Sequence, residues 1–222
     1  MTITFLELYN ECAGQPWSMF DNDAESEEDF ESSMKISINK AVSFLWDYQP
    51  WSFRINTSKI TTRANKAGYT LPEGIILKKV INGENYYGIR YGKTYLTYAK
   101  DYELLDEKTG EPEQFYIEND VLYIYPTPDD VYTLNLKYLS QNYALDEDDN
   151  EIYELKEDTD KLNIPEKYES KFKNCVISLA MIYAIADDSD ENHSGYVRQY
   201  EDALAVLINY CKNGTVDRNI VW

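Results

Sequence analysis

The amino-terminal part of the chain places apolar side chains at the spacing of an α-helix. Apolar residues three or four positions apart predict one long helix, and they are Phe30, Met34, Ile38, Ala41, Val42, Leu45 and Trp46. Ser26-Glu27-Glu28-Asp29 is a capping signal before this helix, and Pro50 ends it. A shorter helix is predicted from the capping box Thr4–Glu7 to Gly14.

The helical period returns after Pro165, a residue that suits the first turn of a helix. A wide apolar face predicts a helix buried on more than one side, formed by Phe172, Cys175, Val176, Leu179, Ile182, Tyr183 and Ala186. Residues 187–195 are predicted to be a polar break. A last helix is then predicted from Tyr196 to Cys211, with Gly214 as its C-cap.

Between these helices the pattern alternates with a period of two. The predicted strands are Phe53–Thr61, Ile75–Ile81, Tyr86–Tyr91, Gln114–Glu118, Val121–Tyr125 and Tyr132–Leu139. Asn82-Gly83 suits a type I′ hairpin turn, and Asn119-Asp120 is predicted to reverse the chain between two strands. Pro126–Asp130 predicts a further reversal. The middle of the chain is therefore predicted to be an antiparallel β region.

This order of elements predicts an α+β fold, with a terminal helical layer of two N-terminal and two C-terminal helices and an antiparallel β-rich middle region. We expect a helical domain formed by residues 1–50 and 163–212 and a β-rich insertion domain at 51–162. Residues 213–222 are predicted to be a C-terminal docking tail.

The tail contains three large apolar residues that are the candidate partner-binding residues, Ile220, Val221 and Trp222. A solvated monomer gains little from exposing such side chains. Docking on a partner is one explanation, and folding back onto the chain's own core is the other.

The chain is strongly acidic: 21 Lys+Arg stand against 40 Asp+Glu in 222 residues, a formal net charge of −19. This excess argues against tight binding to the nucleic-acid backbone or to anionic lipid, because both need clustered cations. The 43% of hydrophobic residues supply enough material for a core. No apolar run is long enough to span a bilayer, so no membrane association is expected.

Few residues are suited to catalysis or cofactor binding. Cys12, Cys175 and Cys211 are too few for a disulfide framework, and with the single His193 they make no zinc pattern. His193 is expected in a polar loop, where a solvated side chain is the ordinary case. Glycine-rich phosphate-binding loops and a Gly-x-Ser-x-Gly elbow are missing from the sequence. We therefore predict no catalytic residue, no cofactor and no enzyme.

One acidic stretch has the spacing of a calcium loop. Asp146, Asp148, Asn150 and Glu157 stand at positions 1, 3, 5 and 12, but Glu151 holds position 6, where the sharp turn needs glycine. A solvated hairpin tip is the favoured alternative, and no metal is predicted. The 21 tyrosines, many of them in the β region, are explained in part by strand propensity, and we expect the remainder at subunit interfaces.

A series of strand and turn motifs goes beyond a generic α+β domain. It comprises Gly110-Glu111-Pro112, Phe115-Tyr116-Ile117, the stretches 119–129 and 132–138, and Leu162–Tyr168 before the two last helices. This series resembles the head-to-tail connector, or adaptor ring, proteins of tailed bacteriophages, and is similar to the tail tubular protein A group and the ring proteins of crAss-like phages. The resemblance covers most of residues 24–212.

The resemblance implies a structural virion protein made in the host bacterial cytoplasm. It implies a ring of twelve copies in the phage neck, joining the portal to other neck and tail proteins, with DNA passing through the lumen. Carboxylates on the lumen wall would keep DNA from sticking. An acidic DNA-mimic inhibitor and a carboxylate-based glycosidase remain as alternatives.

Overall fold

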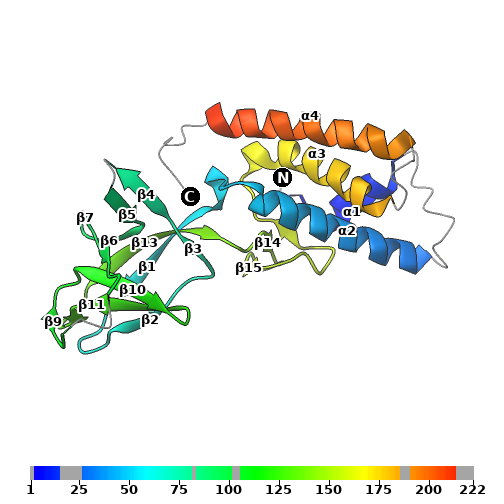
Figure 1. Cartoon of the computed structure of the whole chain (residues 1–222). Coiled ribbons are helices and arrows are strands. Elements are labelled where there is room, and N and C mark those ends of the chain that lie inside the picture. The colour runs from blue at the N-terminus through cyan, green and yellow to red at the C-terminus, as the bar shows by residue number, and fades with distance from the viewer. Residues whose placement is uncertain (1–2, 16–26, 82–83, 102–105, 186–190, 214–222) are drawn as a thin grey trace. The chain divides into compact units, whose positions relative to one another are not determined.

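The computed structural model describes residues 3–15, 27–81, 84–101, 106–185 and 191–213 (Figure 1). These residues form two compact units. The helical unit runs up to Phe53 and resumes at Asn142, and the β unit is Arg54–Gln141. Four α-helices occur in the described residues, two before and two after a largely antiparallel β region, so the predicted α+β class is confirmed.

The helices follow the predicted pattern closely. They are α1 (Phe5–Ala13), α2 (Glu27–Tyr48), α3 (Glu166–Ala184) and α4 (Glu191–Asn213). The predicted capping box is confirmed at α1, where the Glu7 N–H donates to the Thr4 hydroxyl (3.2 Å) and the Thr4 N–H donates to the Glu7 carboxylate (3.0 Å). These bonds satisfy two backbone donors that a helix start leaves unpaired.

Helix α3 is the central helix of its unit and packs against α1, α2 and α4 (Figure 1). Every residue from Cys175 to Met181 is buried, so side chains on all sides of the helix are covered. This confirms the prediction of a helix buried on more than one side, although Tyr183 of the predicted face is 42% exposed and Ala186 lies outside the described residues.

Helix α4 begins earlier than predicted. The expected polar break at 187–195 is wrong for residues 191–195, which are helical, and His193 lies in the first turn of α4 instead of a loop. A solvent-facing first turn needs no apolar residue, and a Cβ at Gly195 would meet nothing within 4 Å. The apolar repeat therefore marks only the part of the helix that packs.

An aromatic corner follows α2 and includes a 3₁₀ turn at Ser52–Arg54. The rings of Trp51 and Phe53 stack at 5.6 Å, and the Trp51 indole N–H donates to the Leu45 carbonyl at 2.6 Å. Phe53 also meets Phe172 of α3 edge to face at 5.9 Å. This corner joins α2 to α3 in one core.

A small three-stranded sheet belongs to the helical unit: β14 (Ala144–Leu145), β15 (Glu151–Ile152) and β16 (Lys161–Leu162). Backbone bonds from the Phe5 N–H to the Asp160 carbonyl (2.8 Å) and from the Leu162 N–H to the Ile3 carbonyl (3.1 Å) attach it to α1. Residues 142–162 thus group with the helices, although their pattern assigns them to the insertion. We propose a two-domain organisation that follows this division.

The β unit is organised around β13 (Thr133–Ser140), which pairs antiparallel with β1 (Ile55–Thr61) along one edge. The other edge of β13 pairs with β6 (Ile89–Tyr91) in its first half and with β3 (Gly74–Ile76) in its second half. A second sheet has the order β2 (Gly68–Thr70), β11 (Val121–Tyr125), β10 (Gln114–Glu118) and β8 (Thr97–Tyr98). The remaining strands are β4 (Lys78–Ile81), β5 (Glu84–Tyr87), β7 (Thr94–Tyr95), β9 (Thr109–Gly110) and β12 (Thr127–Pro128).

The turn between β10 and β11 confirms the predicted reversal, because Asn119 and Asp120 have φ values of 49° and 60°, as a type I′ turn requires. Strands β4 and β5 pair on either side of Asn82-Gly83, whose own geometry lies outside the described residues. Two short pairs, β8 with β10 and β9 with β12, are parallel and were not predicted.

Two predicted strands are each divided in the structure. Ile75–Ile81 becomes β3 and β4, and Tyr86–Tyr91 becomes β5 and β6, with breaks at Leu77 and Gly88. At the break the Lys137 N–H donates to the Gly88 carbonyl, and the Lys137 carbonyl accepts from Leu77. A Cβ on Gly88 would lie 2.5 Å from that Lys137 carbonyl oxygen. The sheet thus needs glycine at the point where the β4–β5 hairpin leaves it.

Candidate functional sites

The predicted partner-binding residues Ile220, Val221 and Trp222 lie outside the described residues, as does the rest of the predicted tail after Asn213. Their docking role stays a prediction. The other candidate functional sites are on the surface of the described residues.

The acidic stretch at 146–150 forms a hairpin turn closed by Asp146. One Asp146 carboxylate oxygen accepts the backbone N–H groups of Asp148 (2.9 Å) and Asn150 (2.8 Å), and the Asn150 amide donates to both oxygens. These bonds, led by the one from the Asn150 side chain, lower the pKa of Asp146. Asn150 therefore presents its amide nitrogen to Asp146, whereas a calcium ligand would present oxygen.

Glu157 belongs to a different turn. Its N–H and that of Lys156 donate to the buried Asp160 carboxylate at 2.8 and 2.7 Å. Within the described ranges, no three His, Cys, Asp or Glu side chains are grouped so that they could hold a metal ion. In both turns a carboxylate accepts backbone N–H groups, and the turn at 146–150 is the tip of the β14–β15 hairpin.

The three cysteines are buried and reduced. Burial raises the pKa of Cys12 and Cys175 to about 12 and that of Cys211 to about 11. The thiols are therefore protonated at neutral pH and are poor nucleophiles. They serve as small apolar core residues.

Exposed apolar side chains follow one line along α2. Ile36, Phe44 and Tyr48 are 53%, 47% and 46% exposed, and with the exposed Lys40 they are spaced four residues apart. The Phe44 and Tyr48 rings lie 6.0 Å apart. We call these four residues the α2 ridge. Its apolar members lie off the buried stripe of the same helix, which is the sequence signal that could have identified them.

A second exposed apolar group lies on α4, where Val206 and Tyr210 are one turn apart. The Tyr210 ring packs edge to face on Tyr168 of α3 at 5.7 Å, and the Lys171 ammonium lies 4.1 Å from its centroid. Tyr210 is thereby held in place although its surface is partly open.

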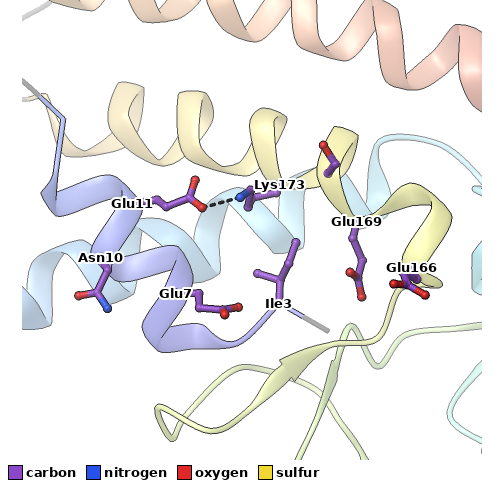
Figure 2. A pocket seen from close by; sticks show the side chains of 8 residues that line it. Ile3, Glu7, Asn10, Glu11, Glu166, Glu169 and Lys173 are labelled. Carbon is purple, nitrogen blue, oxygen red and sulfur yellow. Dashed lines mark hydrogen bonds and ion pairs between the residues drawn. The ribbon is translucent and has the colours of Figure 1, made fainter. Parts of the chain in front are cut away.

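A pocket of about 500 Å³ lies between α1 and α3 (Figure 2). It is lined by Ile3, Glu7, Asn10, Glu11, Glu166, Glu169, Ser170 and Lys173. The described lining residues carry four carboxyl groups and one ammonium group, and Lys173 pairs with Glu11, as the dashed line in Figure 2 marks. The pocket is therefore strongly acidic.

Glu169 is the unusual residue of this pocket because only 6% of its surface is exposed. Burial, reinforced by the like charges of Glu166 and Glu7, raises the pKa of its carboxyl. The sequence contained a signal for it, since Glu169 stands three residues before Phe172 in the buried stripe of α3. A charged residue in such a stripe marks a buried carboxylate, but the sequence could not show what it faces.

The tyrosines of the β unit pack mainly on one another. Tyr116 and Tyr123 stack across β10 and β11 at 4.8 Å, and Tyr87 and Tyr98 lie 5.4 Å apart. Tyr98 is exposed at one end of this group. That the remaining tyrosines lie at subunit interfaces stays a prediction.

The sequence of the chain matches a known protein family. The family model described as SU10 adaptor protein matches residues 5–219. The chain belongs to the SU10 adaptor protein family. It is accordingly a phage adaptor protein, a structural component of the virion instead of an enzyme, which interacts with other head–tail proteins of the phage. The predicted resemblance to phage adaptor proteins is confirmed at this level.

No curated protein matches the chain. Among the described helices, none combines the length and the apolar character needed to cross a membrane. Family membership favours the structural function over the DNA mimic and the glycosidase that the composition left open.

Proposed function

We propose that this SU10 adaptor family protein forms a ring in the phage neck that joins the portal to the tail and surrounds the DNA channel. The observation that carries the proposal is the α2 ridge, read together with family membership. Burying three large apolar side chains against a neighbour is favourable, at roughly 25 cal/mol for each Å² removed from water. In a monomer the apolar side chains of the α2 ridge would stay exposed to water, which gives no such stabilisation.

The proposed subunit contacts are made by helical surfaces, the α2 ridge of one copy and exposed apolar residues such as Val206 and Tyr210 of the next. A Lys in place of Phe44 would bury an unpaired charge in that contact. We expect Phe44→Lys to weaken association between copies about tenfold or more.

The experiment mixes the purified protein with its portal protein and measures ring formation by light scattering and electron microscopy. Val131→Lys is the matched control, because Val131 is 63% exposed in the β unit and receives the same new charge. Rings that form with Val131→Lys and fail with Phe44→Lys support the proposal. A protein that stays monomeric with portal present, or equal behaviour of the two variants, contradicts it.

We further propose that the acidic surface faces the DNA path. The net charge of −19 leaves few cations for phosphate groups to pair with. Assembled rings are therefore expected to bind no duplex DNA at low or moderate salt in a filter-retention assay. Retention of DNA that weakens as salt is added would indicate a basic lumen and contradict this part.

The proposal also includes docking by the tail residues Ile220, Val221 and Trp222 on a neck or tail partner. Replacing all three with Ser is expected to leave the far-ultraviolet circular dichroism unchanged and to reduce co-purification with that partner. A loss of helical signal instead would indicate that these residues fold onto the chain's own core.

A further inference from the structure

One face of the five-stranded sheet in the β unit carries only cations as its charged residues. None of the strands of this sheet, β1, β13, β6, β7 and β3, contains an aspartate or a glutamate. The register pairs Asn135 of β13 with Lys59 of β1 on one side and with Arg90 of β6 on the other, so the three side chains share a face. Because side chains alternate along a strand, Lys137 lies on that face too. We call Lys59, Arg90 and Lys137 the basic face.

The basic face lies on the side of the sheet that is turned away from the β core. Lys59 and Lys137 are exposed, whereas the alternate residues of both strands contribute to the core. Arg90 is half-buried, with its guanidinium 5.3 Å from the centroid of the Tyr95 ring. Among the described residues, none of the three cations forms an ion pair with a carboxylate. Since adjacent strands are only about 4.8 Å apart, these like charges repel one another, and an anionic partner would stabilise the face.

The charge of the chain is divided unevenly between its two units. Residues 54–141 carry 12 Asp+Glu against 11 Lys+Arg, a net charge of −1. The rest of the chain therefore carries −18 of the total of −19. A nearly neutral unit with a basic face complements a strongly acidic unit, so two copies can attract each other through these surfaces although each copy is anionic as a whole.

A dense group of exposed carboxylates lies in the helical unit at residues 147–158. All seven acidic residues of this segment are exposed, and a single lysine interrupts them in the sequence. Some of them pair with cations of their own chain, as Asp158 does with Lys35 at 2.7 Å. Glu147 and Glu157 form no ion pair with a described residue. We call residues 147–158 the acidic segment.

We propose that the basic face of one copy binds the acidic segment of the next copy. The inference rests on the proposed ring, because each copy in a ring presents one patch to the neighbour on one side and a different patch to the neighbour on the other. Carboxylates are the acceptors with which Lys and Arg form charge-assisted hydrogen bonds. Covering the basic face also removes cations from the surface of the ring that phosphate groups could reach, in agreement with the proposed lack of DNA binding.

Duplex DNA is the less favoured occupant of the basic face. Three cations neutralise few phosphate groups, so they supply little of the counterion release on which binding to DNA depends. The net charge of −19 also repels DNA at a distance. A second copy offers carboxylates already fixed on a folded surface, and the experiment includes DNA as an outcome.

The experiment uses a water-soluble carbodiimide, which couples lysines to carboxylates that touch them, on an equal mixture of unlabelled and isotope-labelled full chain with the portal protein. Mass spectrometry recognises cross-links between copies because they join a light peptide to a heavy one. We expect such cross-links from Lys59 or Lys137 to the acidic segment. Rings that form without these cross-links overturn the inference and leave the proposed ring intact.

The inference and the proposed function can also be separated when no ring forms. The proposed function then fails, and the same cross-linking on the full chain alone, at high concentration and low salt, decides the inference. Cross-links between copies from the basic face to the acidic segment support it, and their absence overturns it. No variant is needed for this measurement, so a disturbance of the sheet by substitution cannot obscure the result.

Charge reversal supplies a second readout. Lys59→Glu combined with Lys137→Glu should weaken association between copies about tenfold or more, measured by light scattering, and should reduce its sensitivity to salt. The matched control is Lys66→Glu combined with Lys100→Glu, which makes the same change in charge at two exposed lysines of the β unit outside this sheet. Equal losses in the two variants would show that net charge alone matters and would overturn the inference.

Reversal on both surfaces tests whether they meet. Glu147→Lys combined with Glu157→Lys in the acidic segment should weaken association by itself, and joining these two changes to Lys59→Glu and Lys137→Glu in one chain should restore part of it. Losses that simply add show that the surfaces do not touch, which contradicts the proposal. Duplex DNA that the native chain retains at low salt, and the basic-face variant does not, would assign the face to nucleic acid and overturn the proposal as well.

Discussion

The helical unit and the β unit bury their apolar residues in different ways. In the helical unit α3 is covered by three helices, and its core extends into the aromatic corner around Trp51. In the β unit the burial alternates along β11 and along the first half of β13, and the core is a smaller cluster around Phe115, Leu122 and Leu134. When a buried side chain is truncated, residues packed on all sides can move less to fill the cavity than residues of a sheet with a half-exposed face, so the loss of stability is larger.

The largest expected effect tests this difference directly. Phe172→Ala removes a fully buried ring at the centre of the helical unit and is expected to cost about 3–5 kcal/mol of unfolding free energy. Tryptophan fluorescence in a urea titration measures it, because Trp46 and Trp51 both lie in that core.

Phe115→Ala makes the same change in the β core, where Tyr87 and Tyr98 pack on the ring. It should shift the transition seen by circular dichroism more than the one seen by tryptophan fluorescence. Coincident shifts by both probes would mean that the two units unfold as one, and the comparison would lose its basis.

A glycine pair tests the break in the β unit. Gly88→Ala would place a Cβ against the Lys137 carbonyl and is expected to cost about 1–3 kcal/mol. Gly92→Ala is the matched change, because a Cβ at Gly92 would meet no atom within 4 Å. Its φ of +57° is unfavourable for alanine, so this change is expected to cost about 1 kcal/mol. Thermal unfolding followed by circular dichroism gives both values. Equal costs would indicate that close packing at Gly88 does not restrict the sheet.

In the helical unit the corresponding local feature is the capping box of α1. Thr4→Ala removes the hydroxyl that accepts the Glu7 N–H and is expected to cost about 1 kcal/mol. Thr4→Ser keeps that acceptor and should be close to neutral. The two variants are compared by urea denaturation, and a similar loss in both would point to packing of the Thr4 methyl group.

The smallest expected effect has the opposite sign. The hydroxyl of Tyr200, a residue of α4, is buried and has no hydrogen-bond partner among the described residues. Burial raises the pKa of Tyr200 to about 12. Tyr200→Phe removes the unpaired group and is expected to be neutral or to stabilise by up to about 1 kcal/mol. A clear loss of stability in differential scanning calorimetry would reveal a bond that the hydroxyl makes in solution.

Several elements could be predicted because their sequence signals are local. The capping box at Thr4, the stripe of α2 and the strands Gln114–Glu118 and Val121–Tyr125 follow from spacing, caps and turn residues within a few positions of one another. The α+β class and the resemblance to phage adaptor proteins rest on the order of these elements. The absence of a diagnostic catalytic motif was likewise readable, because such motifs are local patterns.

The tertiary structure alone decided which segments meet. The division of two predicted strands at Leu77 and Gly88 depends on Lys137, about fifty to sixty residues away in the chain, and no local pattern encodes that pairing. The first turn of α4 was missed because its residues Glu191–Gly195 include no apolar side chain and so extend no apolar repeat. The pocket, too, arises only when α1 brings Glu7 to the face of α3 that carries Glu169, since burial and charge depend on neighbours in space and not in sequence.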